Sequence, residues 1–185
     1  MSLSEGESEG LLQLARQAVV QAVAHGQMLQ AIPATGFFSQ HRGVFVTLHI
    51  GKRLRGCIGV VEPDESLADC VVRSAISAAQ KDPRFPAIRP DELPDLHIEL
   101  SLLSPPRPIR PEEIEVGRHG LLVSRGRQRG LLLPQVAVEH HFGPEQFLAE
   151  TCRKAGLPAN AWRDADTKIL GFTCEIFSDR ASRNS

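Results

Sequence analysis

The chain has 185 residues, with 21 lysines and arginines against 22 aspartates and glutamates, so its formal net charge is −1 with neutral histidines. Hydrophobic residues make up 42% of it and charged residues 23%, the composition of an ordinary globular domain. A charge this close to zero argues against a protein whose whole surface is attracted to nucleic acid or an anionic membrane.

The predicted compartment follows from the N-terminal residues and the cysteines. Residues 1–10 contain three glutamates and no lysine or arginine, whereas a secretory signal begins with positive charge and continues with an apolar segment. No stretch approaches the roughly 18 apolar residues of a transmembrane helix. The cysteines lack Cys-x-x-Cys spacing and predict free thiols: Cys57, Cys70, Cys152 and Cys174. We therefore expect a soluble, cytoplasmic protein.

The N-terminal half predicts helices and a hairpin. We expect a disordered acidic tail over residues 1–10, a single domain over residues 11–178 and a second tail over residues 179–185. Apolar residues at helical or alternating spacing predict, in chain order, a helix at 11–26, strands at 44–50 and 53–61, a helix at 66–82 and a strand at 96–102.

The C-terminal half begins with a proline-rich segment at residues 104–111, which predicts a stiff, extended connector. The following pattern predicts strands at 119–124 and 129–133, a short helix after Pro134, a helix at 144–156 and a strand at 168–177. Because helices and hairpins are mixed without regular strand–helix alternation, we expect an α+β fold with antiparallel sheets flanked by helices.

The register of the first hairpin decides which side chains share a face. A two-residue turn would put Arg55 on the apolar face, which is costly for an unpaired charge. A three-residue turn over residues 51–53 puts the apolar residues on one face and leaves Arg55 and Cys57 on the other, beside His49 and Thr47. We expect the three-residue turn.

In this register the side chains of Arg55 and Cys57 point the same way, about 6–7 Å apart along the strand. The fixed positive charge of Arg55 would favour the thiolate of Cys57, the reactive form. Gly56 leaves room for a ligand to approach. The alternative is structural, because cysteines in strands are often buried and glycine in a strand often marks a bulge.

The hexapeptide Leu54–Gly59 resembles the signature of the AMMECR family. Further blocks that resemble the family follow in the same order: Asp82–Pro86, Ile98–Pro105, Gly117–Leu121, Gly130–Ala137 with Glu139, and Cys152–Leu157. The resemblance covers residues 30–178. Phe142 departs from the family pattern, which usually has tryptophan there, but it keeps an aromatic residue.

The resemblance implies two unequal lobes with a cleft between them. The larger lobe would use both chain ends, the smaller would lie roughly within residues 104–135, and the hexapeptide would lie near the cleft. It also implies two partners, a Memo-like protein and a radical SAM protein, since bacterial members are protein A of the AmmeMemoRadiSam system. No motif predicts a cofactor of this chain, so SAM or iron would belong to the partners.

Three further candidates lie in the first part of the chain. Arg84, among prolines, is a candidate for binding an anion or a carboxylate, and the alternative is a salt bridge that ties the loop to the core. Glu99 and Ser101 lie on the polar side of their predicted strand. Glu99 is a candidate partner of Arg55 or Arg84, and the alternative is a solvated position.

The second part of the chain offers three more candidates. His119 is the predicted acid or base, since imidazole gains and loses protons near neutral pH, and the alternative is a structural histidine. Gln135 and Glu139 share one face of a predicted helix, as a ligand donor and as a base or cation partner. The HExxH spacing of zinc enzymes is absent around Glu139, and no metal site is predicted.

Three functions follow from these residues. The first is an enzyme or its substrate-handling subunit, with Cys57 as nucleophile or redox thiol and His119 or Glu139 as acid or base in the cleft. The second is an adaptor that binds a partner protein in the cleft. The third is a nucleic-acid module, suggested by four arginines in Gly117–Gly130 but opposed by the net charge and the 5% aromatic content.

Overall fold

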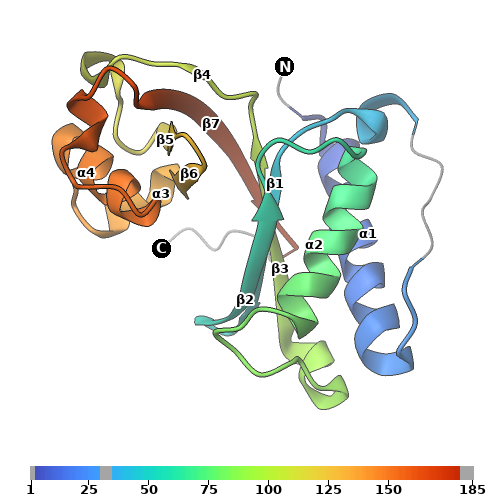
Figure 1. Ribbon diagram of the computed structural model, residues 1–185. Coiled ribbons are helices and arrows are strands. Elements are labelled where there is room, and N and C mark those ends of the chain that lie inside the picture. The colour runs from blue at the N-terminus through green and yellow to red at the C-terminus, as the bar shows by residue number, and fades with distance from the viewer. Residues whose placement is uncertain (1–2, 30–34, 180–185) are drawn as a thin grey trace. The chain divides into compact units, whose positions relative to one another are not determined.

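The structure is a computed structural model that describes residues 3–29 and 35–179 (Figure 1). These residues form two compact units. Unit 1 takes its described residues from 3–29, 35–102 and 175–179, and unit 2 comprises Leu103–Cys174. Helices accompany antiparallel strand pairs in both, which confirms the predicted α+β class. Unit 2 continues well beyond residue 135, whereas the family resemblance implied a smaller lobe roughly within residues 104–135. Within the described residues, no helix has the length and apolar character needed to cross a membrane.

Unit 1 begins with α1 (Glu5–His25), which starts earlier than predicted. The Ser4 hydroxyl accepts a hydrogen bond from the Glu7 N–H, and the Glu7 carboxylate accepts one from the Ser4 N–H, so the helix has a complete capping box. The prediction of a disordered tail is therefore wrong for residues 5–10. Their acidic side chains favour the first turn of a helix, where they complement its dipole.

The rest of unit 1 combines one more α-helix with three strands and the end of a fourth. In chain order these are the 3-10 helix η1 (Gly36–Ser39), β1 (Val44–Ile50), β2 (Arg53–Val60), α2 (Leu67–Gln80), the 3-10 helix η2 (Pro90–Asp95), β3 (Leu96–Leu103) and the end of β7 (Lys168–Ser178). β1 lies between β2 and β3, and β7 follows β3. Figure 1 shows α1 and α2 on one side of these strands.

The two faces of this sheet differ in chemistry. Val46, Leu48 and Leu100 are fully buried and belong to one core cluster with residues of α1 and α2. Because side chains alternate along a strand, their neighbours point to the opposite side. We call that side the polar face, and it carries Phe45, Thr47, His49, Cys57, His97, Glu99 and Ser101.

Asp179 directly follows β7 and is anchored in unit 1, although the sequence predicted a tail from this residue onwards. Its carboxylate accepts a hydrogen bond of 3.0 Å from the Ile98 N–H and also binds Arg16. Its own N–H donates to the Ile98 carbonyl at 3.1 Å. The remaining predicted tail residues, 180–185, lie outside the described residues.

Unit 2 contains β4 (Arg107–Pro108), β5 (His119–Arg125), β6 (Gln128–Leu132) and the first part of β7, with β5 paired to both β6 and β7. Its helices are η3 (Pro111–Glu113), α3 (Pro134–Glu139), α4 (Pro144–Lys154) and η4 (Ala161–Arg163). Leu121, Phe147 and Leu148 form its core together with Ala137, and Phe142 packs against that cluster. Phe142 thus keeps an aromatic packing role.

The proline-rich connector is more ordered than a free extended segment. Arg107 and Pro108 pair with Gly171 and Leu170 of β7. A Cβ atom at Gly171 would lie 2.9 Å from the side chain of Ile109, so a larger residue would require this side chain of the connector to shift. Sequence periodicity could not predict β4, because a two-residue strand has no pattern of its own.

Candidate functional site

The hairpin of β1 and β2 combines features of both predicted registers. Its turn has two residues, because Ile50 lies opposite Arg53. A β-bulge then inserts Arg55 as the extra residue, so that Thr47 lies opposite Cys57. The predicted three-residue turn is therefore wrong, whereas its pairing of Thr47 with Cys57 is confirmed.

Arg55 is 5% exposed and has a partner that the sequence did not predict. Its guanidinium donates to both carboxylate oxygens of Glu92, at 2.9 and 3.0 Å, and to the Pro86 carbonyl at 3.3 Å. The hydrogen bond from Arg55 is the main reason why the pKa of Glu92 is lowered. Glu92, in η2, therefore neutralises Arg55, and the predicted role of Arg55 as the cation of Cys57 is not supported.

The arginine in contact with Cys57 is Arg84. Its Nη2 donates to the Cys57 carbonyl at 3.1 Å, and Asp82 accepts from the Cys57 N–H at 2.9 Å. Asp82 and Arg84 also form a two-point ion pair, with distances of 2.9 and 2.7 Å. This pair is the salt bridge considered as the alternative for Arg84. It fixes the backbone of Cys57 at β2, the first strand of the sheet order.

The charges of this pair reinforce each other. The hydrogen bond from Arg84 is the largest cause that lowers the pKa of Asp82 to about 2, and backbone donors at Cys57 and Arg84 contribute. The pKa of Arg84 is raised, first by the hydrogen bond to Asp82 and further by attraction to Asp82 and Cys57. Asp82 is thus a buried anion that positions Cys57.

Gly56 allows β2 to lie directly on α2. A Cβ atom at this position would lie 2.0 Å from the carbonyl oxygen of Ala78 in the helix backbone. Gly56 therefore faces the helix, opposite to Cys57, and its role is packing, whereas the sequence suggested room for a ligand.

Cys57, Thr47 and Glu99 form a row across β2, β1 and β3 on the polar face. The Thr47 hydroxyl lies 3.3 Å from the Cys57 sulfur, and the thiol is half-buried. Neighbouring strands lie about 4.8 Å apart, so the backbones of Cys57 and Glu99 are about 10 Å apart. Ser101 follows on β3, 1% exposed, and its hydroxyl has no hydrogen-bond partner within the described part of the chain.

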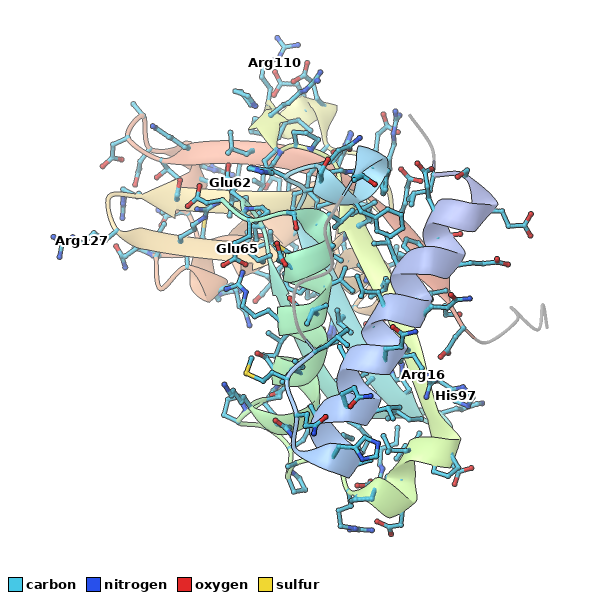
Figure 2. All side chains as sticks on the ribbon, turned by 90° about the vertical axis from the view of Figure 1, so that its right-hand side faces the viewer. Arg16, Glu62, Glu65, His97, Arg110 and Arg127 are labelled. Atoms are coloured by element: carbon cyan, nitrogen blue, oxygen red, sulfur yellow. The ribbon has the colours of Figure 1, made fainter. Side chains whose placement is uncertain are left out.

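The polar face continues into a hollow of about 320 Å³, lined among others by His49, Lys52, His97 and Glu99. His49 lies directly opposite His97. Figure 2 shows His97 close to Arg16, and Asp179 lies near both, 3.9 Å from the His97 ring nitrogen. No group of three histidine, cysteine or acidic side chains suited to a metal ion occurs among the residues described.

The three remaining candidates belong to unit 2. The Glu115 N–H donates to Nδ1 of His119 at 3.0 Å. Gln135 and Glu139 both lie on α3, where the amide oxygen of Gln135 is buried without a partner in the described structure and Glu139 is exposed. Their proposed cooperation with Cys57 of unit 1 stays a prediction.

The arginine-rich segment Gly117–Gly130 is partly neutralised. Arg118 donates to both carboxylate oxygens of Glu115 at 3.0 Å. Arg125 binds Asp164 at 2.8 Å. Because Arg118 and Arg125 are already paired to acids, this segment offers a weaker phosphate-binding surface than its sequence suggests.

Known proteins resemble the chain over nearly its full length. The family model described as AMMECR1 matches residues 12–177. A protein of Thermococcus gammatolerans is 46% identical over 187 residues, which cover 95% of this chain and 91% of that protein. A protein of Methanothermobacter thermautotrophicus is 44% identical, with 96% of each chain covered. The crystal structure of protein PH0010 from Pyrococcus horikoshii, 40% identical, matches with a TM-score of 0.89 over 99% of this chain and 96% of that one.

Proposed function

Because this chain belongs to the AMMECR1 family, as its sequence blocks predict, we propose that it binds a small molecule or a peptide segment on the polar face, next to Cys57. In this proposal it is the substrate-handling member of a system with a Memo-like protein and a radical SAM protein. The observation that carries the proposal is the row of Cys57, Thr47 and Glu99, with the unpartnered Ser101 hydroxyl on the same face.

The chemistry of this row suits a reactive thiol. A hydroxyl at hydrogen-bond distance from sulfur stabilises the thiolate, which is the nucleophilic form. Glu99 lies too far along the row to take the proton of Cys57, but its carboxylate can accept a hydrogen bond from a ligand bound on the same face. The backbone of Cys57 is held by Asp82 and Arg84, and such a fixed backbone reduces the cost of positioning a substrate.

Ser101 supports a ligand in this place for an energetic reason. A buried hydroxyl without a partner costs about 1–3 kcal/mol. A ligand that hydrogen-bonds to it would remove this cost. Replacement of Ser101 by alanine should therefore leave the free energy of unfolding unchanged or raise it, while it weakens ligand binding. A structural serine would show the opposite, a loss of stability.

The test is alkylation of the native chain by iodoacetamide at several pH values, with each cysteine followed by peptide mass spectrometry. Cys70 and Cys152 are internal controls, since both are fully buried and burial raises the pKa of each thiol. We expect Cys57 to react at least tenfold faster than either control at pH 7. The variant Thr47→Val should slow the alkylation of Cys57 and leave the alkylation rates of Cys70 and Cys152 unchanged.

Two outcomes would overturn the proposal. If Cys57 reacts only when Cys70 and Cys152 do, upon unfolding, the thiol is a packing residue and the polar face holds no accessible site. If the chain binds the Memo-like protein stoichiometrically, and neither Cys57→Ser nor alkylation changes any activity of the reconstituted three-protein system, the chain is an adaptor.

A further inference from the structure

Unit 2 contains a hollow of about 360 Å³ between the connector and β7, separate from the residues of the polar face. Its apolar lining comes from Pro105, Pro108, Ile109 and Phe172. The pairing of β4 with β7 holds the connector in place along one side. A volume of this size lies at the lower end of the range of small-molecule sites.

The hydrogen bond that His119 accepts determines which of its two ring nitrogens carries the proton and can donate it to a ligand. Nδ1 accepts the N–H of Glu115 at 3.0 Å, so Nδ1 carries the lone pair and no proton. The proton of the neutral ring must then be on Nε2. His119 lines the hollow, and it therefore offers an N–H donor there.

Two further groups in the lining donate hydrogen bonds. Arg107 is exposed, and its guanidinium has no hydrogen bond or ion pair within the described ranges. The Ser104 hydroxyl accepts the N–H of Thr173 at 2.9 Å, which leaves its own hydrogen available. The lining of this hollow includes no aspartate or glutamate.

We propose that this hollow binds an organic carboxylate with an apolar body. The carboxylate would bind the Arg107 guanidinium, which matches its two oxygens, and the Nε2–H of His119. The apolar body would lie against Ile109 and Phe172. A positive charge, neutral donors and an apolar wall without a competing acid select this class over a bare anion or a cation.

The test uses calorimetric titration of the full chain with phenylacetate, with phenylacetamide as its uncharged counterpart and inorganic phosphate as a bare anion. We expect phenylacetate to bind at least tenfold more tightly than either, since a hydrogen bond to a charged group contributes about this factor or more. Arg107→Gln should weaken phenylacetate binding at least tenfold. The control is Arg127→Gln. Arg127 projects from the β5–β6 turn (Figure 2) and is not among the residues that line the hollow, so this change should alter the affinity for phenylacetate less than twofold.

Two substitutions of His119 separate the donor from the structural hydrogen bond. His119→Asn keeps an oxygen near the position of Nδ1, where it accepts the Glu115 N–H, and removes the donor. His119→Gln places an amide N–H near the position of Nε2. We expect Asn to weaken phenylacetate binding at least fivefold and Gln to weaken it less.

The proposal fails if phenylacetamide or phosphate binds as tightly as phenylacetate, or if Arg127→Gln weakens binding as much as Arg107→Gln. It also fails if His119→Asn retains full affinity. Cys57→Ser should leave phenylacetate binding unchanged, so this site and the polar face succeed or fail independently.

Discussion

Replacement of Asp82 by asparagine should lower the free energy of unfolding, because it removes the carboxylate that holds the backbone of Cys57. The carboxylate of Asp82 accepts hydrogen bonds from the Cys57 N–H and from the backbone and side chain of Arg84. Its pKa falls from 3.8 to about 2, chiefly because of the Arg84 side chain. Each pKa unit corresponds to about 1.4 kcal/mol, so ionised Asp82 contributes about 2–3 kcal/mol to the free energy of unfolding.

Asp82→Asn should therefore lower the free energy of unfolding by about 2–3 kcal/mol at pH 7, since the amide also presents N–H groups to donors. The lowered pKa gives the sign of the pH dependence. The contribution is fully present above the unfolded pKa of 3.8 and is lost as pH falls through the folded value of about 2. The difference in the free energy of unfolding between the parent and Asp82→Asn should shrink to about half its value by pH 3.

Urea denaturation followed by far-UV circular dichroism at pH 7, 5, 4 and 3 measures this difference. The matched control is Asp91→Asn, because Asp91 also pairs with a neighbouring arginine, Arg89, but both side chains are 69% exposed. The control should change stability little at any pH. A loss of less than about 0.5 kcal/mol in the free energy of unfolding at pH 7, or an equal loss at pH 3, would show that the Asp82 carboxylate does not stabilise the chain through Arg84.

Three other substitutions, two in the hexapeptide and one in α1, are measured by the same urea assay. Gly56→Ala should cost at least about 2 kcal/mol, because its Cβ would meet the Ala78 carbonyl oxygen at 2.0 Å, and an unchanged midpoint would contradict this contact. Gly6→Ala should raise stability by up to about 1 kcal/mol, because Gly6 lies in α1 with nothing within 4 Å of an added Cβ. Arg55→Met should cost about 3–5 kcal/mol because it leaves Glu92 without its partner, and the double change with Glu92→Met should cost less; equal costs would argue against the pair.

Local patterns were sufficient to predict most elements. Val44–Ile50 was predicted with the bounds that the structure has, because its apolar residues alternate and one face is buried. The start of α1 was predicted too late. There the acidic residues after Ser4 form a capped first turn, which resembles a solvated tail in composition alone.

The candidate site was only partly predictable, since its contacts join distant segments. Cys57 and Glu99 were placed on polar strand faces by alternation, and the structure has them in one row. The sequence does not indicate the partner of Arg55, because Glu92 lies between the predicted helix at 66–82 and the predicted strand at 96–102, outside any periodic pattern. The sequence indicates Asp82 only as the end of a helix. Arg84, two residues later, is the signal that this aspartate could be a buried anion with a partner of its own.

Unit 1 is interrupted in the chain by the whole of unit 2, and this order has a consequence for biosynthesis. The residues that complete unit 1 beside β3, from Glu175 to Asp179, leave the ribosome only after all of unit 2 has been made. Until then the edge of β3 and the N–H of Ile98 lack the partners they have in the finished protein. Unit 2 is continuous and can fold during translation, whereas unit 1 reaches its final form through one late loop closure across the full length of unit 2.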